Sequence, residues 1–159
     1  MTLLSVLHRQ QKQDADCLAA CTQIVLHYLH ISIPYSRLLQ LLETDRAGSY
    51  FSKIKKLEAD LGLVVELVQG NDELDLFYRY LDQALPVIVF VNTAELKSYW
   101  TVPTFHAVVV TGLDDELIYL HDPYFPDAPK EVQRDEFLLA WLEQDYWYAV
   151  IRLTDHYSL

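Results

Sequence analysis

Glycine, cysteine and long apolar runs are all scarce in this sequence, and each scarcity excludes a class of protein. Only four of the 159 residues are glycine, and neither GxGxxG nor GxxxxGKS/T occurs, which excludes a glycine-rich phosphate-binding loop. No stretch approaches the roughly 18 consecutive apolar residues of a membrane-spanning helix, so we predict no integral membrane segment. The first residues, MTLLSVLHRQQKQ, lack a basic segment and a small-residue cleavage site, so we expect no secretory signal.

Basic residues are scarce as well. Twelve Lys and Arg stand against 23 Asp and Glu, which gives a formal net charge of -11. Nucleic-acid binding needs a basic face, so we expect no nucleic-acid partner. The only cysteines, Cys17 and Cys21, lie four positions apart on a predicted helix, where a disulfide between them has poor geometry. We therefore expect free thiols in a reducing, cytoplasmic environment.

The rest of the composition is that of an ordinary folded domain. Hydrophobic residues make up 52% of the chain and aromatic residues 13%, which is enough to fill a core. The length suits one domain, and no internal repeat, low-complexity segment or linker divides the chain. We predict a single domain over residues 1–159. Nothing in the sequence predicts its oligomeric state.

Apolar residues at helical spacing predict that most helices lie in the first half of the chain. Asp16 is a plausible N-cap of the first helix, Pro34 fits the first turn of the second, and Gly62 is the C-terminal stop of the third. Asn71 or Asp72 is expected to cap the fourth. The predicted helices cover residues 17–30, 34–43, 51–62 and 71–85, with a short strand at 63–68 before the last of them.

β-Branched residues predict strands in the second half. Asp114 and Asp115 are expected to form a tight turn between two of these strands. The predicted strands cover residues 86–92, 105–113, 116–123 and 146–153, and a short helix at 134–143 precedes the last one. Because helices come first and strands later, without βαβ alternation, we predict an α+β domain with a mostly antiparallel sheet.

Cys17 is a candidate nucleophile because of its position. The polar run RQQKQDAD leads directly into this cysteine, which opens the first apolar helix. The first turn of a helix is the positive end of its macrodipole, which favours a thiolate, and the free backbone N–H groups there can face a developing oxyanion. A cysteine in an apolar helix is also commonly a small core residue. This stretch alone leaves both interpretations open.

A nucleophilic thiol needs a base and a group that orients the base. His106 lies in the apolar run TFHAVVVTG, and Asp122 ends the next predicted strand in HDP. Across the hairpin the two residues are nearly level, so they could form such a pair, whereas His121 alternates to the opposite face. The alternatives are a structural histidine in the core and an aspartate that starts a turn before proline.

A second oxyanion donor could come from the amide-rich loop before Cys17. The side chain of Gln11 could supply it, and Gln10 and Gln13 are competitors that spacing does not exclude. A solvated polar loop is the alternative for all three. The aromatic residues Tyr99, Trp100, Tyr124, Phe125 and Trp147 could line a substrate groove, although core packing is the commoner use of such residues.

The motifs QKQDADC, FHAVVV and HDP resemble those of the bacteriocin-processing peptidases, papain-like cysteine peptidases that cut leader peptides after a double-glycine motif. The resemblance implies that Gln11 belongs to the oxyanion hole, that the Asp16–Cys17 pair carries the nucleophile, and that His106 and Asp122 complete the site. The segments GSYFSKIKKLEADLGL, LPVIVFVN and EFLLAWLE extend the resemblance over nearly the whole chain, in order. It implies a papain-like fold in which N-terminal helices pack on a mostly antiparallel sheet.

Two features differ from the family pattern. Leu18 follows the nucleophile where the family usually has glycine. Members that process bacteriocins are commonly the N-terminal domain of a membrane transporter, whereas this sequence has no membrane segment, so we predict a stand-alone, divergent member.

The leading functional hypothesis is a cysteine peptidase that acts on a peptide or protein substrate. Cys17 attacks the carbonyl, His106 moves the proton, Asp122 orients the imidazole, and Gln11 with the backbone N–H of Cys17 stabilises the oxyanion. No metal or cofactor is implied. The alternatives are a catalytically idle papain-like domain that binds a peptide, and a related reaction such as side-chain amide hydrolysis or acyl transfer. A zinc site would spread its ligands over more than ~13 residues of one helix, too far for a tetrahedral cage.

Overall fold

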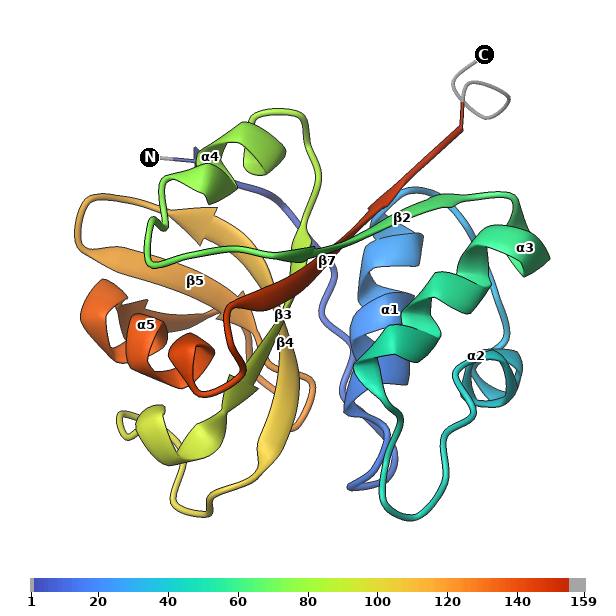
Figure 1. Cartoon of the computed structure of the whole chain (residues 1–159), viewed down its shortest axis with the longest axis horizontal. Coiled ribbons are helices and arrows are strands. Elements are labelled where there is room, and N and C mark those ends of the chain that lie inside the picture. The colour runs from blue at the N-terminus through green and yellow to red at the C-terminus, as the bar shows by residue number, and fades with distance from the viewer. Residues whose placement is uncertain (1, 155–159) are drawn as a thin grey trace.

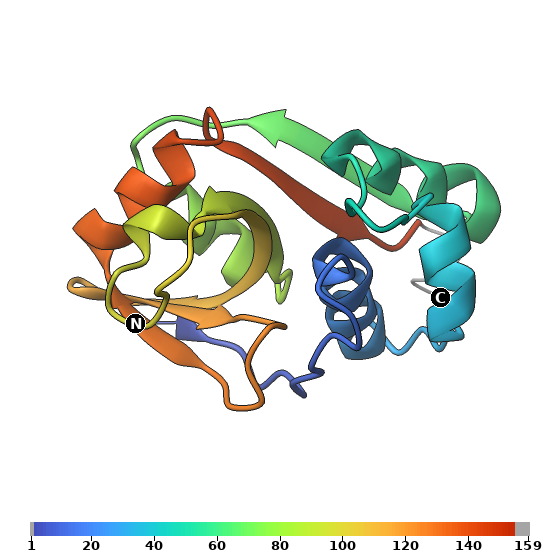
Figure 2. The ribbon, with the colours of Figure 1, turned by 90° about the horizontal axis from the view of Figure 1, so that it is seen from below.

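The computed structural model describes residues 2–154, in which a helical layer stands beside an antiparallel sheet (Figure 1). The helical layer comprises α1 (Cys17–Tyr28), α2 (Tyr35–Leu41), the 3-10 helix η1 (Phe51–Lys56) and α3 (Leu57–Leu61). The helices α4 (Leu76–Leu81) and α5 (Arg134–Leu142) lie on the other face of the sheet, as Figure 2 shows from a second direction.

All strand pairs of the sheet are antiparallel within the described residues. The strands are β1 (Thr2–Leu3), β2 (Val64–Gln69), β3 (Val87–Asn92), β4 (Phe105–Leu113), β5 (Leu117–His121), β6 (Lys130–Gln133) and β7 (Trp147–Arg152), and the 3-10 helix η2 (Thr93–Glu95) follows β3. Their order is β2-β7-β3-β4-β5-β6, with β1 paired to β4. The predicted α+β class with an antiparallel sheet is confirmed.

The central strand β4 is buried on both faces, which explains its uninterrupted apolar sequence. Ala107 and Val109 pack into the same core as Leu18 of α1. Val108 and Val110, which alternate with them, pack into a second core with residues of α4 and α5. Alternate side chains of β4 therefore pack against the helical layer on one face of the sheet and against α4 and α5 on the other.

The predicted helices and strands are found, with changes at their ends. The strand predicted at 105–113 has those bounds, and Asp114 forms the predicted turn by accepting hydrogen bonds from the backbone N–H of Glu116 and Leu117 at 2.8 and 2.7 Å. Gly62 ends α3 in the left-handed conformation, with φ of 65°, as predicted. The helix predicted at 51–62 is a 3-10 helix in its first half.

Other predictions of detail were wrong. The fourth helix is confined to Leu76–Leu81; Asn71 accepts a hydrogen bond from the backbone N–H of Glu73 in a turn before the helix instead of capping it. Pro34 occupies the N-cap of α2 instead of its first turn. The short strands β1 and β6 and the 3-10 helix η2 were not predicted, since two to four residues carry too little periodicity.

Asp16 stands at the N-cap position of α1, but its side chain does not cap the helix. Its buried carboxylate instead accepts hydrogen bonds from the backbone N–H of Gln13, at 3.2 Å, and from the hydroxyl of Tyr35, at 3.0 Å. Asp16 thus fixes the polar loop before Cys17 against the start of α2. The predicted N-cap is corrected to a loop anchor.

Candidate active site

Cys17 is the first residue of α1, where a polar loop meets the core. Its side chain is half-buried and packs against the core of the helical layer, while the next residue, Leu18, is fully buried. The backbone N–H groups of a first helical turn lack partners within the helix, so they surround the thiol with donors. The position therefore suits a reactive thiol that remains accessible.

His106 and Asp122 form a buried pair on neighbouring strands. His106 is the second residue of β4 and Asp122 directly follows β5. The pairing of Val109 with His121 brings Asp122 beside Val108, two residues along β4 from His106. The imidazole Nε2 lies 2.7 Å from Asp122 Oδ1, and the two residues are 3% and 0% exposed. The structure thus brings together the two residues that the sequence proposed as base and orienter.

The charge balance at His106 favours its protonated form. Burial acts to lower the pKa of His106, but hydrogen bonds to Asp122 and Cys17 outweigh it and raise the pKa to about 9. Because Nε2 is bonded to Asp122, Nδ1 is the ring nitrogen left for the thiol. The imidazole thus uses Nε2 for the Asp122 carboxylate, and the neighbouring Cys17 acts on its pKa.

Asp122 is held by four donors. Oδ1 accepts from His106 and from the backbone N–H of Tyr124 at 3.0 Å, while Oδ2 accepts from the hydroxyl of Tyr99 and the indole N–H of Trp100, both at 2.8 Å. Burial alone would raise the pKa of Asp122, but its bond to His106 and the other donors lower it below its usual value. The carboxylate is therefore ionised at neutral pH.

His121 has different partners, as its alternation predicted. Its Nδ1 lies 3.2 Å from Nδ1 of His8, and Nε2 of His8 donates to the carbonyl of Phe125 at 2.7 Å. Which of the two Nδ1 atoms donates depends on the tautomers of the rings. Burial, and then the charge of His8, lower the pKa of His121 to about 4.

Gln11 is close to the site through its backbone. Its N–H donates to the carbonyl of Pro123, the residue after Asp122, at 2.7 Å. Its side-chain Nε2 donates to the carbonyls of Gln13 and Asp14 at 2.8 and 3.1 Å, and its buried Oε1 has no partner in the described part of the chain. Both amide hydrogens are thus engaged by the loop itself, and the oxyanion role of Gln11 stays a prediction.

The competing glutamines lie differently. The side chain of Gln10 donates to the carbonyl of Tyr124 at 3.1 Å, on the exposed side of the same loop. Gln13 is exposed and contributes its backbone to Asp16 and Gln11. Neither side chain is directed into the region between Cys17 and His106 by a hydrogen bond of the structure.

Cys21 belongs to the core. It is fully buried and free, and burial, followed by the charges of Cys17 and Asp122, raises the pKa of its thiol well above the usual value. A protonated, inaccessible thiol is unreactive. Within residues 2–154 no group of three His, Cys, Asp or Glu side chains could hold a metal ion.

A cavity of about 320 Å³ adjoins His106. It lies under the loop between β3 and β4, and four of the five predicted groove aromatics line it; Trp147 lies in β7 and is not among them. Phe105, at its edge, is 69% exposed. The lining residues are Asp14, Tyr99, Trp100, Thr101, Val102, Thr104, Phe105, His106, Tyr124 and Phe125.

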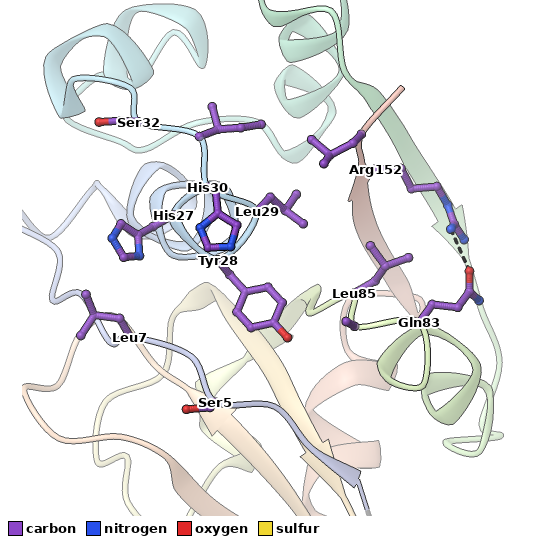
Figure 3. Close-up of a pocket in the computed structure, with 13 residues that line it drawn as sticks. Ser5, Leu7, His27, Tyr28, Leu29, His30, Ser32, Gln83, Leu85 and Arg152 are labelled. Atoms are coloured by element: carbon purple, nitrogen blue, oxygen red, sulfur yellow. Dashed lines mark hydrogen bonds between the residues drawn. The ribbon is translucent and has the colours of Figure 1, made fainter. Parts of the chain in front are cut away.

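A larger cavity, about 990 Å³, lies at the other end of α1 (Figure 3). Tyr28 enters it from the last turn of α1, and Arg152 stands at its side, bonded to Gln83 at 3.0 Å. None of the four candidate catalytic residues lines it, whereas the smaller cavity includes His106.

The sequence missed the donors to Asp122. Tyr99 and Trp100 were considered as groove walls or as packed aromatic residues, yet each donates a hydrogen bond to the carboxylate. Both are aromatic residues with a hydrogen-bond donor, adjacent in a loop that precedes the histidine strand. Two adjacent donors of this kind indicate that the pair makes hydrogen bonds, but they do not identify the acceptor.

Known proteins resemble this chain in sequence and in structure. The lactococcin-G-processing and transport ATP-binding protein LagD of Lactococcus lactis subsp. lactis is 27% identical over 131 residues, which are 82% of this chain and 17% of that protein. The chain thus spans about a sixth of the length of this curated relative.

In the described residues no helix is long and apolar enough to cross a membrane.

Three solved structures share the fold. A C39-like peptidase from Bacillus anthracis matches with a TM-score of 0.76 at 18% identity, covering 96% of this chain and 98% of that one. A double-glycine motif protease from an AMS/PCAT transporter, in complex with the leader peptide, matches with 0.74 at 18% identity, covering 96% and 95%. The peptidase domain of Streptococcus ComA, a bifunctional ABC transporter, matches with 0.74 at 19% identity, covering 92% and 97%.

The papain-like fold predicted from the motifs is therefore confirmed by structural neighbours of the same kind. The family-level match covers most of the chain and includes Cys17, His106 and Asp122. Because residues 5–145 match the Peptidase C39 family, this chain belongs to that family of cysteine peptidases.

Proposed function

We propose that this chain hydrolyses a peptide bond with Cys17 as nucleophile, His106 as acid and base, and Asp122 as the group that orients His106. The observation that carries the proposal is the buried 2.7 Å bond between His106 and Asp122, whose imidazole also interacts with the thiol at the start of α1. A nucleophile, a base and an orienter in contact are the parts that a thiol peptidase needs.

The reaction begins with a thiolate and an imidazolium. With its pKa raised to about 9, His106 is protonated at pH 7, and this charge favours the thiolate of Cys17. The sulfur attacks the peptide carbonyl, and the C–O π electrons move to oxygen. When this intermediate collapses, the C–N bond breaks and His106 gives its proton to the amine. His106 then takes a proton from the water that attacks the thioester, and Cys17 leaves as thiolate.

The oxyanion would form beside the first turn of α1. The backbone N–H of Cys17 is one donor, since it lies at the positive end of the helix. Gln11 is the second proposed donor, because its backbone bond to Pro123 holds it beside the Asp122 loop. Its side chain must release the carbonyl of Gln13 or Asp14 before it can donate to substrate. We expect substrate binding to rearrange this loop.

The proposed substrate is a leader peptide with a double-glycine motif. The relatives support this choice: one is a double-glycine motif protease in complex with a leader peptide, and another processes lactococcin G. The cavity beside His106 offers room for side chains next to the cut bond. The two free thiols are in keeping with a reducing, cytoplasmic location, which we propose together with a single-domain organisation.

Peptide binding without turnover is the second candidate function. The state of Gln11 favours it, because an amide engaged by its own loop leaves the oxyanion with fewer donors. Removing one such donor from an active site costs about a hundredfold or more in kcat. The two candidates differ in whether an acyl-enzyme forms, and side-chain amide hydrolysis or acyl transfer would share that intermediate with proteolysis.

The first test measures the reactivity of Cys17. Iodoacetamide alkylation is followed by peptide mass spectrometry between pH 5 and 9 for the wild type and His106→Ala, with buried Cys21 as internal reference. We expect fast alkylation of Cys17 at pH 7 that becomes markedly slower in His106→Ala. Cys21 should stay unmodified in both. Equal rates in the two proteins would contradict the proposed Cys17–His106 pair.

The second test measures turnover. A synthetic peptide with a helical leader that ends in Gly-Gly, followed by a short cargo, is incubated with the wild type and with Cys17→Ala. Mass spectrometry of the products identifies the broken bond. Cleavage after Gly-Gly by the wild type alone supports the proposal, and a bound but intact peptide supports the second candidate.

A further inference from the structure

Two adjacent aromatic residues reach the buried carboxylate from outside its strand. Tyr99 and Trp100 lie in the loop between β3 and β4, and the backbone N–H groups of both donate to the carbonyl of Leu96, at 3.2 and 2.9 Å. This turn directs both side chains to the same atom. The Tyr99 hydroxyl and the Trp100 indole N–H each lie 2.8 Å from Asp122 Oδ2.

These two donors complete the coordination of the carboxylate. A carboxylate has about four acceptor sites on its two oxygens, and His106 and the backbone N–H of Tyr124 occupy those of Oδ1. Asp122 is fully buried, so no water could replace a lost donor. Tyr99 and Trp100 therefore supply the hydrogen bonds of Oδ2. By fixing Oδ2, they also fix the direction in which Oδ1 points.

Both groups donate to Oδ2, which is the arrangement that an ionised carboxylate accepts. Burial and the neighbouring Asp122 charge raise the pKa of Tyr99 well above its usual value, so its hydroxyl keeps its proton. An indole N–H only donates. A protonated Oδ2 would find no acceptor in Trp100, and the Tyr99 hydroxyl would have to stop donating and accept instead. The two residues thus favour the ionised carboxylate as well as its orientation.

The rings of the same residues exclude water from the pair. Trp100 lies with its ring centroid 5.1 Å from that of His106 and 4.7 Å from that of Tyr124, and Tyr99 packs edge-on against Phe125 at 5.3 Å.

The charged group nearest to Tyr99 from β6 is Lys130, with Nζ 5.7 Å from the ring centroid. From α5, the charge of Glu136 raises the pKa of Tyr99. The other titratable groups near Asp122 are His106 and Cys17.

We propose that Tyr99 and Trp100 are positioning residues that keep Asp122 ionised and aimed at His106, and that this clamp sustains the Cys17–His106 ion pair. The inference rests on the proposed function, since it assigns a role to the donors of the proposed catalytic carboxylate. Loss of either donor weakens the hold of Asp122 on the imidazolium. The thiolate of Cys17 then forms only at higher pH.

The experiment compares Tyr99→Phe and Trp100→Phe with two matched controls away from the site. Tyr148→Phe removes a hydroxyl that is 2.9 Å from the hydroxyl of Tyr80, and Trp141→Phe removes an indole N–H bonded to the carbonyl of Trp147 at 3.0 Å. The readout is the pH profile of iodoacetamide alkylation at Cys17, with the urea midpoint of each variant measured in parallel.

The clamp variants should move the alkylation profile toward higher pH by about one unit each, since a hydrogen bond to a charged group contributes about as much as one pH unit does. The controls should lower the urea midpoint without moving the profile. In an Asp122→Asn background no carboxylate remains to be positioned. There, Tyr99→Phe should cause no additional movement.

Two results would overturn the inference, and they differ in what they mean for the proposed catalytic site. If Tyr99→Phe and Trp100→Phe leave the profile unchanged while His106→Ala and Asp122→Asn move it, the clamp is absent and the proposed catalytic site stands. If none of the four moves it, the proposed function fails together with the inference. Tyr99→Phe removes a single oxygen atom, so we expect this variant to stay folded and to test the inference even if Trp100→Phe unfolds.

Discussion

Two buried histidines with opposite pKa shifts should give the stability of this protein a maximum near pH 6.5. The pKa of His106 is raised from 6.5 to about 9, so its contribution is fully present below pH 6.5 and is lost as the pH rises through about 9. The pKa of His121 is lowered from 6.5 to about 4, so its contribution is present above pH 6.5 and is lost as the pH falls through about 4. At 1.36 kcal/mol per pH unit, each contribution amounts to about 3 kcal/mol.

The assay is urea unfolding followed by fluorescence from pH 4 to pH 9.5, for the wild type, His106→Gln and His121→Gln. The control is His27→Gln, whose side chain is exposed at the far end of α1. Groups that contact neither histidine, such as buried Cys21, contribute alike in all four proteins and cancel in the differences. Relative to the wild type, His106→Gln should lose the alkaline dependence and His121→Gln the acid dependence. Parallel curves for wild type and His106→Gln above pH 6.5 would refute the reasoning.

Three further substitutions test the site. Asp122→Asn should reduce kcat strongly and destabilise the protein by about 2 kcal/mol or more, because one amide cannot accept from two pairs of buried donors; peptide cleavage and urea midpoints measure both, and retained activity would contradict the assignment. Cys21→Ala should cost about 1 kcal/mol and leave the alkylation of Cys17 unchanged. Gln11→Ala should lower kcat about a hundredfold with little change in KM if Gln11 is an oxyanion donor. Gln13→Ala, whose side chain is exposed, is its control in peptide kinetics.

The sheet could be predicted from sequence because its strands carry strong local signals. The strand 105–113 was predicted at its observed bounds, since nine residues dense in valine and buried on both faces permit few alternatives. The fourth helix was predicted too long because the polar residues on either side of Leu76–Leu81 form turns. In one of them the Asn71 side chain accepts a hydrogen bond from the backbone N–H of Glu73. Local propensity does not distinguish these outcomes.

The site was predictable to the extent that it depends on strand pairing. His106 and Asp122 are joined by one hairpin, so their contact follows from the turn at Asp114 and the register of β4 with β5. The clamp is different, because Tyr99 and Trp100 reach Asp122 from 23 and 22 residues away through an irregular loop. No periodicity specifies the path of such a loop, so its hydrogen bonds appear only in three dimensions.

The candidate site lies where two layers of the fold meet, and hydrogen bonds join the layers there. His8 donates to Phe125, Gln10 to Tyr124 and Gln11 to Pro123, so the segment before Cys17 runs along the segment after Asp122. The helical layer supplies the thiol and the sheet supplies the imidazole and the carboxylate.

Because these bonds fix one layer against the other beside the site, we expect the distance between the Cys17 sulfur and the His106 imidazole to depend on them. The two layers also share a core, in which Leu18 of α1 packs with Ala107 and Val109 of β4. Weakening them should therefore impair the alignment of Cys17 with His106 before it unfolds the chain. The loop around Gln11 thus has two tasks, to hold the layers in register and to present an amide at the place where the oxyanion would form.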